Sequence, residues 1–336
     1  MRYIKFFIIY ILCILCISCN HSDKVKVGFL CWNNSNSYAQ KNVKCFKEKA
    51  LQLGVEVIDK DARSSESEQY NQAVELINQG VKVLVVYAVN TVSAAAIVRI
   101  AHKEGVKIIA YDRMIKNCDL DYYVTFDSQK VGEYMAREAI AQKPKGNYLL
   151  LGGDKGDDNA DLVKSGIMKV LKTQIDLGNI KLSYNNYIED WSYENAQHEV
   201  DKIMRLSSNS KIDAVVASCD DMARAAIAVI KKNQTNSNTF VSGQNSDIES
   251  LKAILSGDQT VTICKSPKTF GYAVAELAVK LATHADTKLS FEVNAAIFNG
   301  YYQVPSILFD PVLITKSNLE KVILSDGLTS KEELFN

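Results

Sequence analysis

The chain has 336 residues and a mass of 37.3 kDa, about twice the length typical of one domain, so we expect two domains. Hydrophobic residues make up 47% and charged residues 23%, which excludes a disordered or fibrous chain and allows a large buried core. The 39 Lys and Arg residues balance the 39 Asp and Glu residues, so the composition indicates no nucleic-acid partner. We expect a small or neutral ligand.

The first segment, residues 1–19, has the features of an export signal. Two basic residues precede a 12-residue apolar run at residues 6–17, shorter than the roughly 20 residues that a helix needs to cross a bilayer. Residues 16–19 resemble a bacterial lipobox, so we expect cleavage before Cys19, lipidation of Cys19 and a tether over residues 20–23. The alternative is an uncleaved anchor. Both place the protein on the periplasmic side of the cell envelope, attached to the membrane.

Cysteine and histidine residues give no sign of a disulfide framework or a metal site. Without the signal and Cys19, five of the eight cysteines remain, widely spaced and with no C-x-x-C. The four histidines form no H-E-x-x-H arrangement, and no G-x-S-x-G marks a nucleophile. We therefore expect no metal, no cofactor and no enzymatic activity.

From Lys24 onward, short β-branched runs alternate with stretches of helical period, which is typical of βαβ units and parallel sheets. In the first half we expect strands at 25–31, 55–59, 83–86, 107–110 and 124–126, and helices at 39–53, 66–79 and 92–104. In the second half we expect strands at 148–151, 180–182, 214–217, 240–243 and 260–263, and helices at 131–141, 160–177, 193–206, 222–231 and 248–255. A late helix at 270–281 and strands at 303–309 and 312–315 follow. The pattern predicts an α/β fold with two similar, doubly wound, Rossmann-like halves.

Ligands of open α/β sheets bind beyond the carboxyl ends of the strands, so residues that follow the predicted strands are candidate contacts. Polar and aromatic side chains gather there: Trp32, Asn33, Tyr87, Asp112, Arg113, Asp157, Asn159, Trp191, Cys219, Asp220, Gln244, Asn245 and Lys265. Planar aromatic rings beside hydrogen-bond donors and acceptors suit a sugar, which has apolar C–H faces and a rim of hydroxyl groups.

Several motifs together resemble the D-xylose-binding group of the type I periplasmic sugar-binding family. They extend from Val25 to about Asp326 and include residues 77–85, 111–114, 126–133, 157–160, 211–218, 242–244 and 304–306. The resemblance implies two Rossmann-like lobes joined by three hinge crossovers, with a sugar held between them. It also implies lobe limits of 24–129 with 266–309 for the N-terminal lobe, and 130–265 with 310–333 for the C-terminal lobe.

The resemblance also assigns sugar contacts. They fall on Asp112, Arg113, Asp157, Asn159, Trp191, Asp220, Asn245 and Lys265, with Trp32, Asn33 and Tyr38 as further candidates in the first lobe. The chain departs from the xylose binders at three places. Tyr38-Ala39 stands where they have Arg-Trp, Cys219 where they have Asn, and Asn245 where they have Asp.

Simpler interpretations remain open for some of these residues. Asp112 and Arg113 could form a surface ion pair, Trp191 could cap a core, Lys265 could be an ordinary surface lysine and Cys219 a small buried hydrophobe. The acidic group at residues 154–161 could begin a helix, and its spacing does not match a calcium loop.

We expect an exported, monomeric binding protein that captures a monosaccharide and delivers it to the permease of an ABC-type transporter by hinge closure. The alternative is a sugar sensor that docks on a receptor or histidine-kinase ectodomain. A DNA-binding repressor with the same lobes is not expected, because nothing before Lys24 resembles a helix-turn-helix and the predicted export excludes that role.

Overall fold

The computed structural model describes residues 24–206, 211–233, 238–283, 289–326 and 329–335. The predicted signal segment, the tether and Cys19 lie outside these residues. Within the described residues, no helix has both the length and the apolar character required to cross a membrane.

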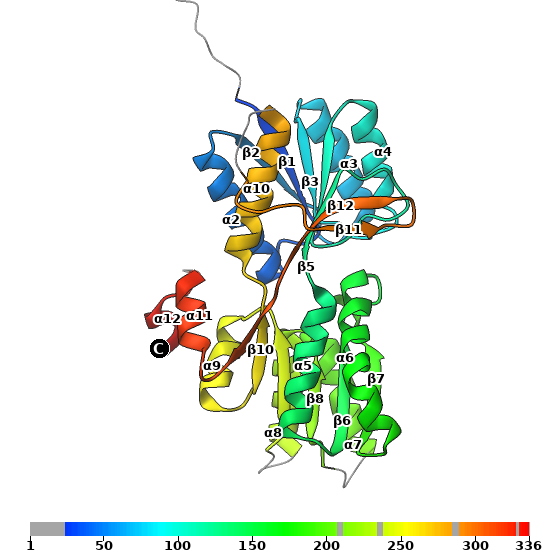
Figure 1. The fold of residues 1–336 in the computed structure, drawn as a ribbon, viewed down its shortest axis with the longest axis vertical. Helices are drawn as coiled ribbons and strands as arrows, with labels where there is room; N and C mark the ends of the chain where they lie inside the picture. Colours follow the sequence, from blue (N-terminus) through cyan, green and yellow to red (C-terminus); the bar gives the residue numbers. More distant parts are fainter. Residues whose placement is uncertain (1–23, 207–210, 234–237, 284–288, 327–328, 336) are drawn as a thin grey trace, which may run out of the picture.

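The chain forms two lobes, one above the other in Figure 1, each built on a mixed sheet with helices on both faces. The N-terminal lobe has the strand order β11-β12-β5-β4-β3-β1-β2. Its strands are β1 (Lys26–Cys31), β2 (Glu56–Asp61), β3 (Val83–Val86), β4 (Lys107–Tyr111), β5 (Tyr122–Phe126), β11 (Ala295–Phe298) and β12 (Gln303–Phe309). Its helices are α2 (Ser37–Gln52), α3 (Glu66–Asn78), α4 (Ala95–Lys103) and α10 (Pro267–Thr283).

The C-terminal lobe has the strand order β13-β10-β9-β8-β6-β7. Its strands are β6 (Gly146–Gly152), β7 (Ile180–Tyr187), β8 (Ala214–Ala217), β9 (Phe240–Gln244), β10 (Val261–Cys264) and β13 (Val312–Thr315). Its helices are α5 (Ser128–Gln142), α6 (Asp158–Asp176), η1 (Glu189–Trp191), α7 (Tyr193–Leu206), α8 (Asp220–Asn233), α9 (Ile248–Ser256), α11 (Leu319–Asp326) and α12 (Lys331–Phe335).

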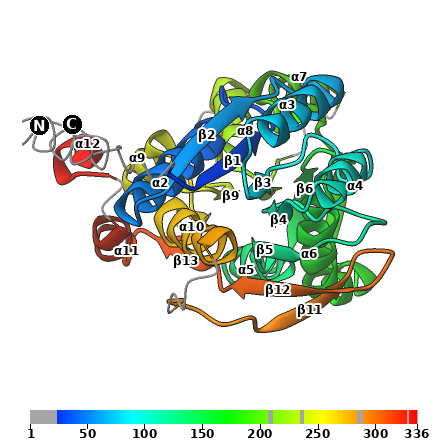
Figure 2. The same ribbon diagram turned by 90° about the horizontal axis from the view of Figure 1, so that it is seen from above.

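The chain passes between the lobes at three points: from β5 to α5, from β10 to α10, and from β12 to β13. The predicted α/β class with two doubly wound lobes and three crossovers is therefore confirmed. The late helix is α10, which returns to the first lobe and lies beside α2 (Figure 2). The sequence prediction missed β11, η1, α11 and α12, which are all short.

Buried apolar residues explain both sheets. The strand Val83–Val86 is buried on both faces, as expected for a central parallel strand covered by helices on each side. In the N-terminal lobe, α2 and α10 cover one face of the sheet and α3 and α4 the other. In the C-terminal lobe, α5 and α6 cover one face and α7 and α8 the other.

Two glycines allow α5 and α6 to pack backbone against backbone. A Cβ atom on Gly132 would lie 2.0 Å from the carbonyl oxygen of Val163, and one on Gly166 would lie 2.0 Å from that of Gln129. Neither backbone oxygen can move without shifting its helix. This contact fixes the start of α6, which carries Asp157 and Asn159 at the edge of the cleft.

Candidate functional site

A cavity of about 50 Å³ lies between the lobes, at the carboxyl ends of strands from both sheets. The first lobe contributes Trp32, Asn36, Tyr38, Tyr87, Asp112 and Arg113. The second lobe contributes Asp157, Asn159, Trp191, Cys219, Asp221, Gln244 and Asn245, and the crossover into α10 contributes Lys265. The structure thus brings together side chains that are as much as 233 positions apart (265 minus 32).

Most residues that the sequence singled out line this cavity. Of the contacts that the resemblance assigns, those that do are Trp32, Tyr38, Asp112, Arg113, Asp157, Asn159, Trp191, Asn245 and Lys265. Asp220 and Asn33 do not line it. The amide of Asn33 donates to Ser64 Oγ at 3.0 Å, and its oxygen accepts from the backbone N–H of Ser35, so it stabilises the loop after β1.

Asp220 is fully buried inside the C-terminal lobe. Its carboxylate accepts from Thr262 Oγ1 at 2.8 Å, from Gln259 Nε2 at 3.1 Å and from the backbone N–H of Asp247 at 2.9 Å. Gly243, which has no side chain, leaves room for it. The neighbouring Asp221 lines the cavity in its place, because successive residues at a helix start project in different directions.

Arg113 forms a buried ion pair with the opposite lobe rather than a surface pair with Asp112. Its Nε lies 3.0 Å from Asp157 Oδ2, its Nη1 donates to the carbonyl of Ala88 at 3.0 Å, and its guanidinium lies 4.5 Å from the centre of the Trp32 ring. Burial lowers the pKa of Arg113, but Asp157 together with Tyr87, Asp112 and Asp154 outweighs this effect and leaves that pKa raised. Burial raises the pKa of Asp157, and Arg113 opposes the shift. The surface-pair interpretation is therefore wrong.

Asp112 has a left-handed backbone conformation, with φ of 62°, that turns the chain at the end of β4. Its carboxylate accepts from Tyr87 Oη at 2.9 Å and lies 3.8 Å from Lys265 Nζ. Its carbonyl oxygen accepts from Asn159 Nδ2 at 3.0 Å, across the cleft. These contacts keep the carboxylate and the ammonium of buried Lys265 at the cavity wall, so Lys265 is not an ordinary surface lysine.

Several buried polar atoms of the cavity-lining residues have no hydrogen-bond partner in the part of the chain that the structure describes. Trp32 Nε1 and Trp191 Nε1 are donors, and Gln244 Oε1 and Asn245 Oδ1 are acceptors. Leaving such groups buried and unsatisfied is costly, so they are suited to a ligand that both donates and accepts. Hydroxyl groups have this property.

Trp191 and Cys219 have both a packing role and a place at the cavity. Trp191 packs against the core cluster under α7 and α8, and a Cβ atom on Gly153 would collide with its ring at 2.1 Å. Cys219 is buried with its Sγ 3.7 Å from the carbonyl oxygen of Trp191. Burial raises the pKa of Cys219 far above its ordinary range, so the side chain is a neutral thiol.

The acidic group at residues 154–161 forms the start of α6 and its contacts. Asp157 accepts from the backbone N–H of Asn159 at the helix start, and Asp158 lies 2.7 Å from Lys116 of the other lobe. Asp154 accepts from the backbone N–H of Asp190, and Asp161 accepts from Tyr187. These residues do begin a helix, but Asp157 is buried rather than solvated, and Asp157 and Asp158 both pair with the first lobe.

Five cavity residues are not among the contacts that the resemblance assigns: Asn36, Tyr87, Cys219, Asp221 and Gln244. Tyr87, Cys219 and Gln244 lie at or just after the ends of strands, so the strand-end rule marks them as candidates. Asn36 caps α2 by accepting from the backbone N–H of Ala39, and a side chain with that role gives no separate signal for a ligand contact.

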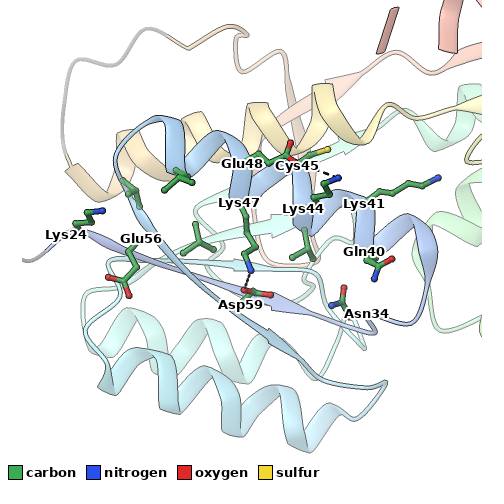
Figure 3. Close-up of a pocket in the computed structure, with 14 residues that line it drawn as sticks. Lys24, Asn34, Gln40, Lys41, Lys44, Cys45, Lys47, Glu48, Glu56 and Asp59 are labelled. Carbon is green, nitrogen blue, oxygen red and sulfur yellow. Dashed lines mark hydrogen bonds and ion pairs between the residues drawn. The ribbon is translucent and has the colours of Figure 1, made fainter. Parts of the chain in front are cut away.

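A larger groove of about 900 Å³ lies elsewhere, on the outer side of the N-terminal lobe between α2 and β2 (Figure 3). Lysine side chains, among them Lys44 and Lys47, line it, and Lys47 is paired with Asp59 at 2.5 Å. It contains none of the residues that line the cavity between the lobes.

The fold and the cavity define a class of protein: a two-lobed binding protein that encloses a small ligand at the carboxyl ends of its strands. A model of the periplasmic binding protein domain matches residues 27–286, and the chain belongs to this family.

Named relatives agree with this assignment. The chain is 35% identical over 316 residues to the D-xylose-binding periplasmic protein of Haemophilus influenzae, covering 94% of each chain. It is 30% identical over 284 residues to the multiple sugar-binding periplasmic receptor ChvE of Rhizobium radiobacter, covering 79% of this chain and 80% of the relative. These relatives are binding proteins, which confirms that this is a binding protein and not an enzyme.

A solved structure shows the same architecture. An ABC transporter solute-binding protein from Clostridium phytofermentans, with bound β-D-glucose, matches with a TM-score of 0.85 and 26% identity. The match covers 92% of this chain and 99% of that chain, so both lobes and their connections are shared.

The buried Asp220 generates a prediction on stability. Burial and the nearby Asp247 raise the pKa of Asp220 to about 7 from an ordinary 3.8. The folded protein therefore binds more protons than the unfolded chain between these two values, and its stability falls as the pH rises through that window. We predict that the free energy of unfolding of the wild type, relative to that of Asp220→Asn, falls from about pH 4 to about pH 7 and is level above it. Urea denaturation at a series of pH values measures this difference.

The control for this prediction is Asp176→Asn, which removes an exposed carboxylate at the end of α6. Its difference from the wild type should lack the slope seen for Asp220. A difference between wild type and Asp220→Asn that does not change with pH would contradict the prediction.

Proposed function

We propose that this protein binds one neutral monosaccharide, D-xylose or a related sugar, between its lobes and delivers it to an ABC-type transporter. The observation that carries the proposal is the set of buried, unpartnered groups among the described cavity residues: two indole N–H donors and two amide oxygens. They lie beside charges that are already paired with each other, so an uncharged ligand with hydroxyl groups matches them. The names of the relatives support a sugar ligand.

The proposed mechanism is hinge closure. The cavity of about 50 Å³ has room for a few water molecules at most. A sugar ring is larger, so it enters when the lobes, 24–129 with 266–309 and 130–265 with 310–333, separate about the three crossovers. Closure then places groups of both lobes around the sugar, and the ligand stabilises the closed population.

The contacts that we propose for the sugar are Asp112, Arg113, Asp157, Asn159, Trp191, Asn245 and Lys265, with Trp32, Tyr38, Tyr87, Asp221 and Gln244 completing the wall. Arg113 and Asp157 offer donors and acceptors in fixed positions, and the indole rings offer apolar faces to the C–H groups of the sugar. We assign Asp220 to the support of the Asp247 turn rather than to the ligand.

A second candidate function is sugar sensing, in which the closed protein docks on a receptor or histidine kinase. The observation that favours it is the receptor name of the Rhizobium radiobacter relative. Uptake of labelled xylose by cells with and without this protein separates the two functions, since only transport requires the protein for uptake.

We predict that the purified protein binds one pentose or hexose per chain and that its melting temperature rises with the sugar concentration. Calorimetry against a panel of monosaccharides measures the stoichiometry and the affinity. A charged sugar acid serves as the control and should bind more weakly, because the cavity charges are already paired. The absence of any melting shift with every neutral sugar at millimolar concentration would refute the proposal.

We predict that D-xylose binds more weakly here than a sugar whose hydroxyl groups fit a thiol at Cys219 and an amide at Asn245, both in the cavity wall. A thiol is a poor hydrogen-bond donor. A carboxylate only accepts hydrogen bonds, whereas an amide both donates and accepts them, so the two are not equivalent. The double variant Cys219→Asn with Asn245→Asp should raise the xylose affinity about tenfold, equal to about 1.4 kcal/mol. Calorimetry checks it, with Cys118→Ser as a control at a cysteine that does not line the cavity. Unchanged xylose affinity in a folded double variant would place the discriminating contacts elsewhere, and Tyr38 would be the next position to test.

We also propose that Cys19 carries a lipid that holds the protein on the periplasmic side of the membrane. Replacing Cys19 with Ser should release the protein from the membrane fraction, because the lipid is the anchor. Replacing Cys13 with Ser, within the apolar run, is the matched control and should leave the protein in that fraction. If Cys19→Ser remains with the membranes, the N-terminal segment is an uncleaved anchor.

A further inference from the structure

A contact between the lobes lies outside the residues that line the sugar cavity. The hydroxyl group of Ser37 donates to Asp247 Oδ1 at 3.1 Å, and Lys41 Nζ lies 3.8 Å from the same oxygen. Ser37 and Lys41 belong to α2 of the first lobe, whereas Asp247 precedes α9 of the second. Asp247 is buried, at 6% exposure. Because its partners belong to the opposite lobe, this contact exists only while the lobes are together.

The position of Asp247 in the chain makes this contact unusual. Asp247 is the N-cap residue of α9, where an aspartate side chain ordinarily accepts a hydrogen bond from its own helix. Its carboxylate makes no such bond and instead lies at the first turn of α2, whose first residue is Ser37. The positive end of the α2 dipole favours a carboxylate there.

The turn that carries Asp247 also carries cavity residues. Gln244 and Asn245 line the cavity, and Asn245 and Ser246 both have positive φ, at 104° and 58°. A non-glycine residue in this conformation is strained unless its surroundings hold it. Asp220 holds this turn by accepting from the backbone N–H of Asp247 at 2.9 Å.

We propose that Asp247 is a positioning residue: with Ser37 and Lys41 it stabilises the closed arrangement of the lobes, and it thereby sets the sugar affinity without touching the sugar. This inference rests on the proposed sugar binding and deepens it. The turn at residues 244–247 links sugar binding to lobe closure. Sugar contacts at Gln244 and Asn245 would hold the same turn that places Asp247 against α2.

The other charged groups near Asp247 are consistent with this role. Arg224 Nη1 lies 4.0 Å from Asp247 Oδ2 and 3.8 Å from Glu249, and all three residues belong to the C-terminal lobe. The ion pair between Lys116 and Asp158 also joins the lobes, at 2.7 Å, but both side chains are partly exposed, at 40% and 27%. Exposed pairs contribute little, and Lys41 is also 36% exposed, so of these two contacts we assign the larger contribution to the buried Asp247 carboxylate and its hydrogen bond from Ser37.

The test compares two properties of the purified protein: its radius of gyration without sugar, from small-angle scattering, and its dissociation constant for D-xylose, from calorimetry. Asp247→Ala should enlarge the sugar-free radius of gyration and weaken xylose binding by about tenfold, with little change in melting temperature. The double variant Ser37→Ala with Lys41→Met removes the contact from the other lobe and should have the same effects. If Asp247→Ala does not fold, this double variant still tests whether the contact stabilises the closed arrangement.

Glu249→Ala is the matched control, since Glu249 lies in the first turn of the same helix and has no contact with the first lobe among its ion pairs. Both measured properties should stay at the wild-type values. The proposal is overturned if the Asp247 and Ser37/Lys41 variants leave the radius of gyration unchanged, or if Glu249→Ala shifts it equally. A wild type that does not bind xylose would count against the proposed ligand alone, and scattering would still decide the role of Asp247.

Discussion

The ion pair between Arg113 and Asp157 joins the two lobes at the centre of the molecule, and both side chains are about 6–7% exposed. Removing two charges from water is expensive, and their attraction in the interior only offsets that cost. When the lobes separate, both groups regain water. The pair therefore makes closure nearly neutral in free energy, and smaller contributions decide whether the lobes stay together.

Aromatic rings of the first lobe position the cations at the cavity wall. The Arg113 guanidinium lies over the ring of Trp32 at 4.5 Å and that of Tyr87 at 5.5 Å, which positions it without a second carboxylate. Lys265 similarly lies 4.8 Å from the centre of the Tyr38 ring. Tyr38 therefore presents an aromatic face, and no charge, to the cation on this wall.

The sequence predicts the long elements well, because buried strands such as Val83–Val86 and helices of clear period leave a strong pattern. The strand β11 was missed because it is a four-residue edge strand, although the Asn299-Gly300 dipeptide that follows it is a hairpin-turn signal. The choice between Asp220 and Asp221 could not be made from the sequence, because adjacent carboxylates at a helix start differ only in direction. The partner of Arg113 also lay beyond prediction. That partner depends on how the two lobes pack against each other, and no local sequence pattern predicts this packing.

The three crossovers also constrain how the molecule is assembled. The strand β12 pairs with β5 and β11 in the first sheet, and α10 covers the same face as α2, yet both elements follow the whole central part of the second lobe in the chain. During synthesis, which starts at the N-terminus, the first lobe cannot be completed until residues near 309 have been made. In contrast, five strands of the second sheet follow one another in the chain between Gly146 and Cys264. Contacts so distant in sequence form slowly. The second lobe can therefore fold early, while the apolar surface of the first lobe that α10 covers is still exposed. A fragment that ends after β5 would lack α10 and β12, which complete the core of the first lobe.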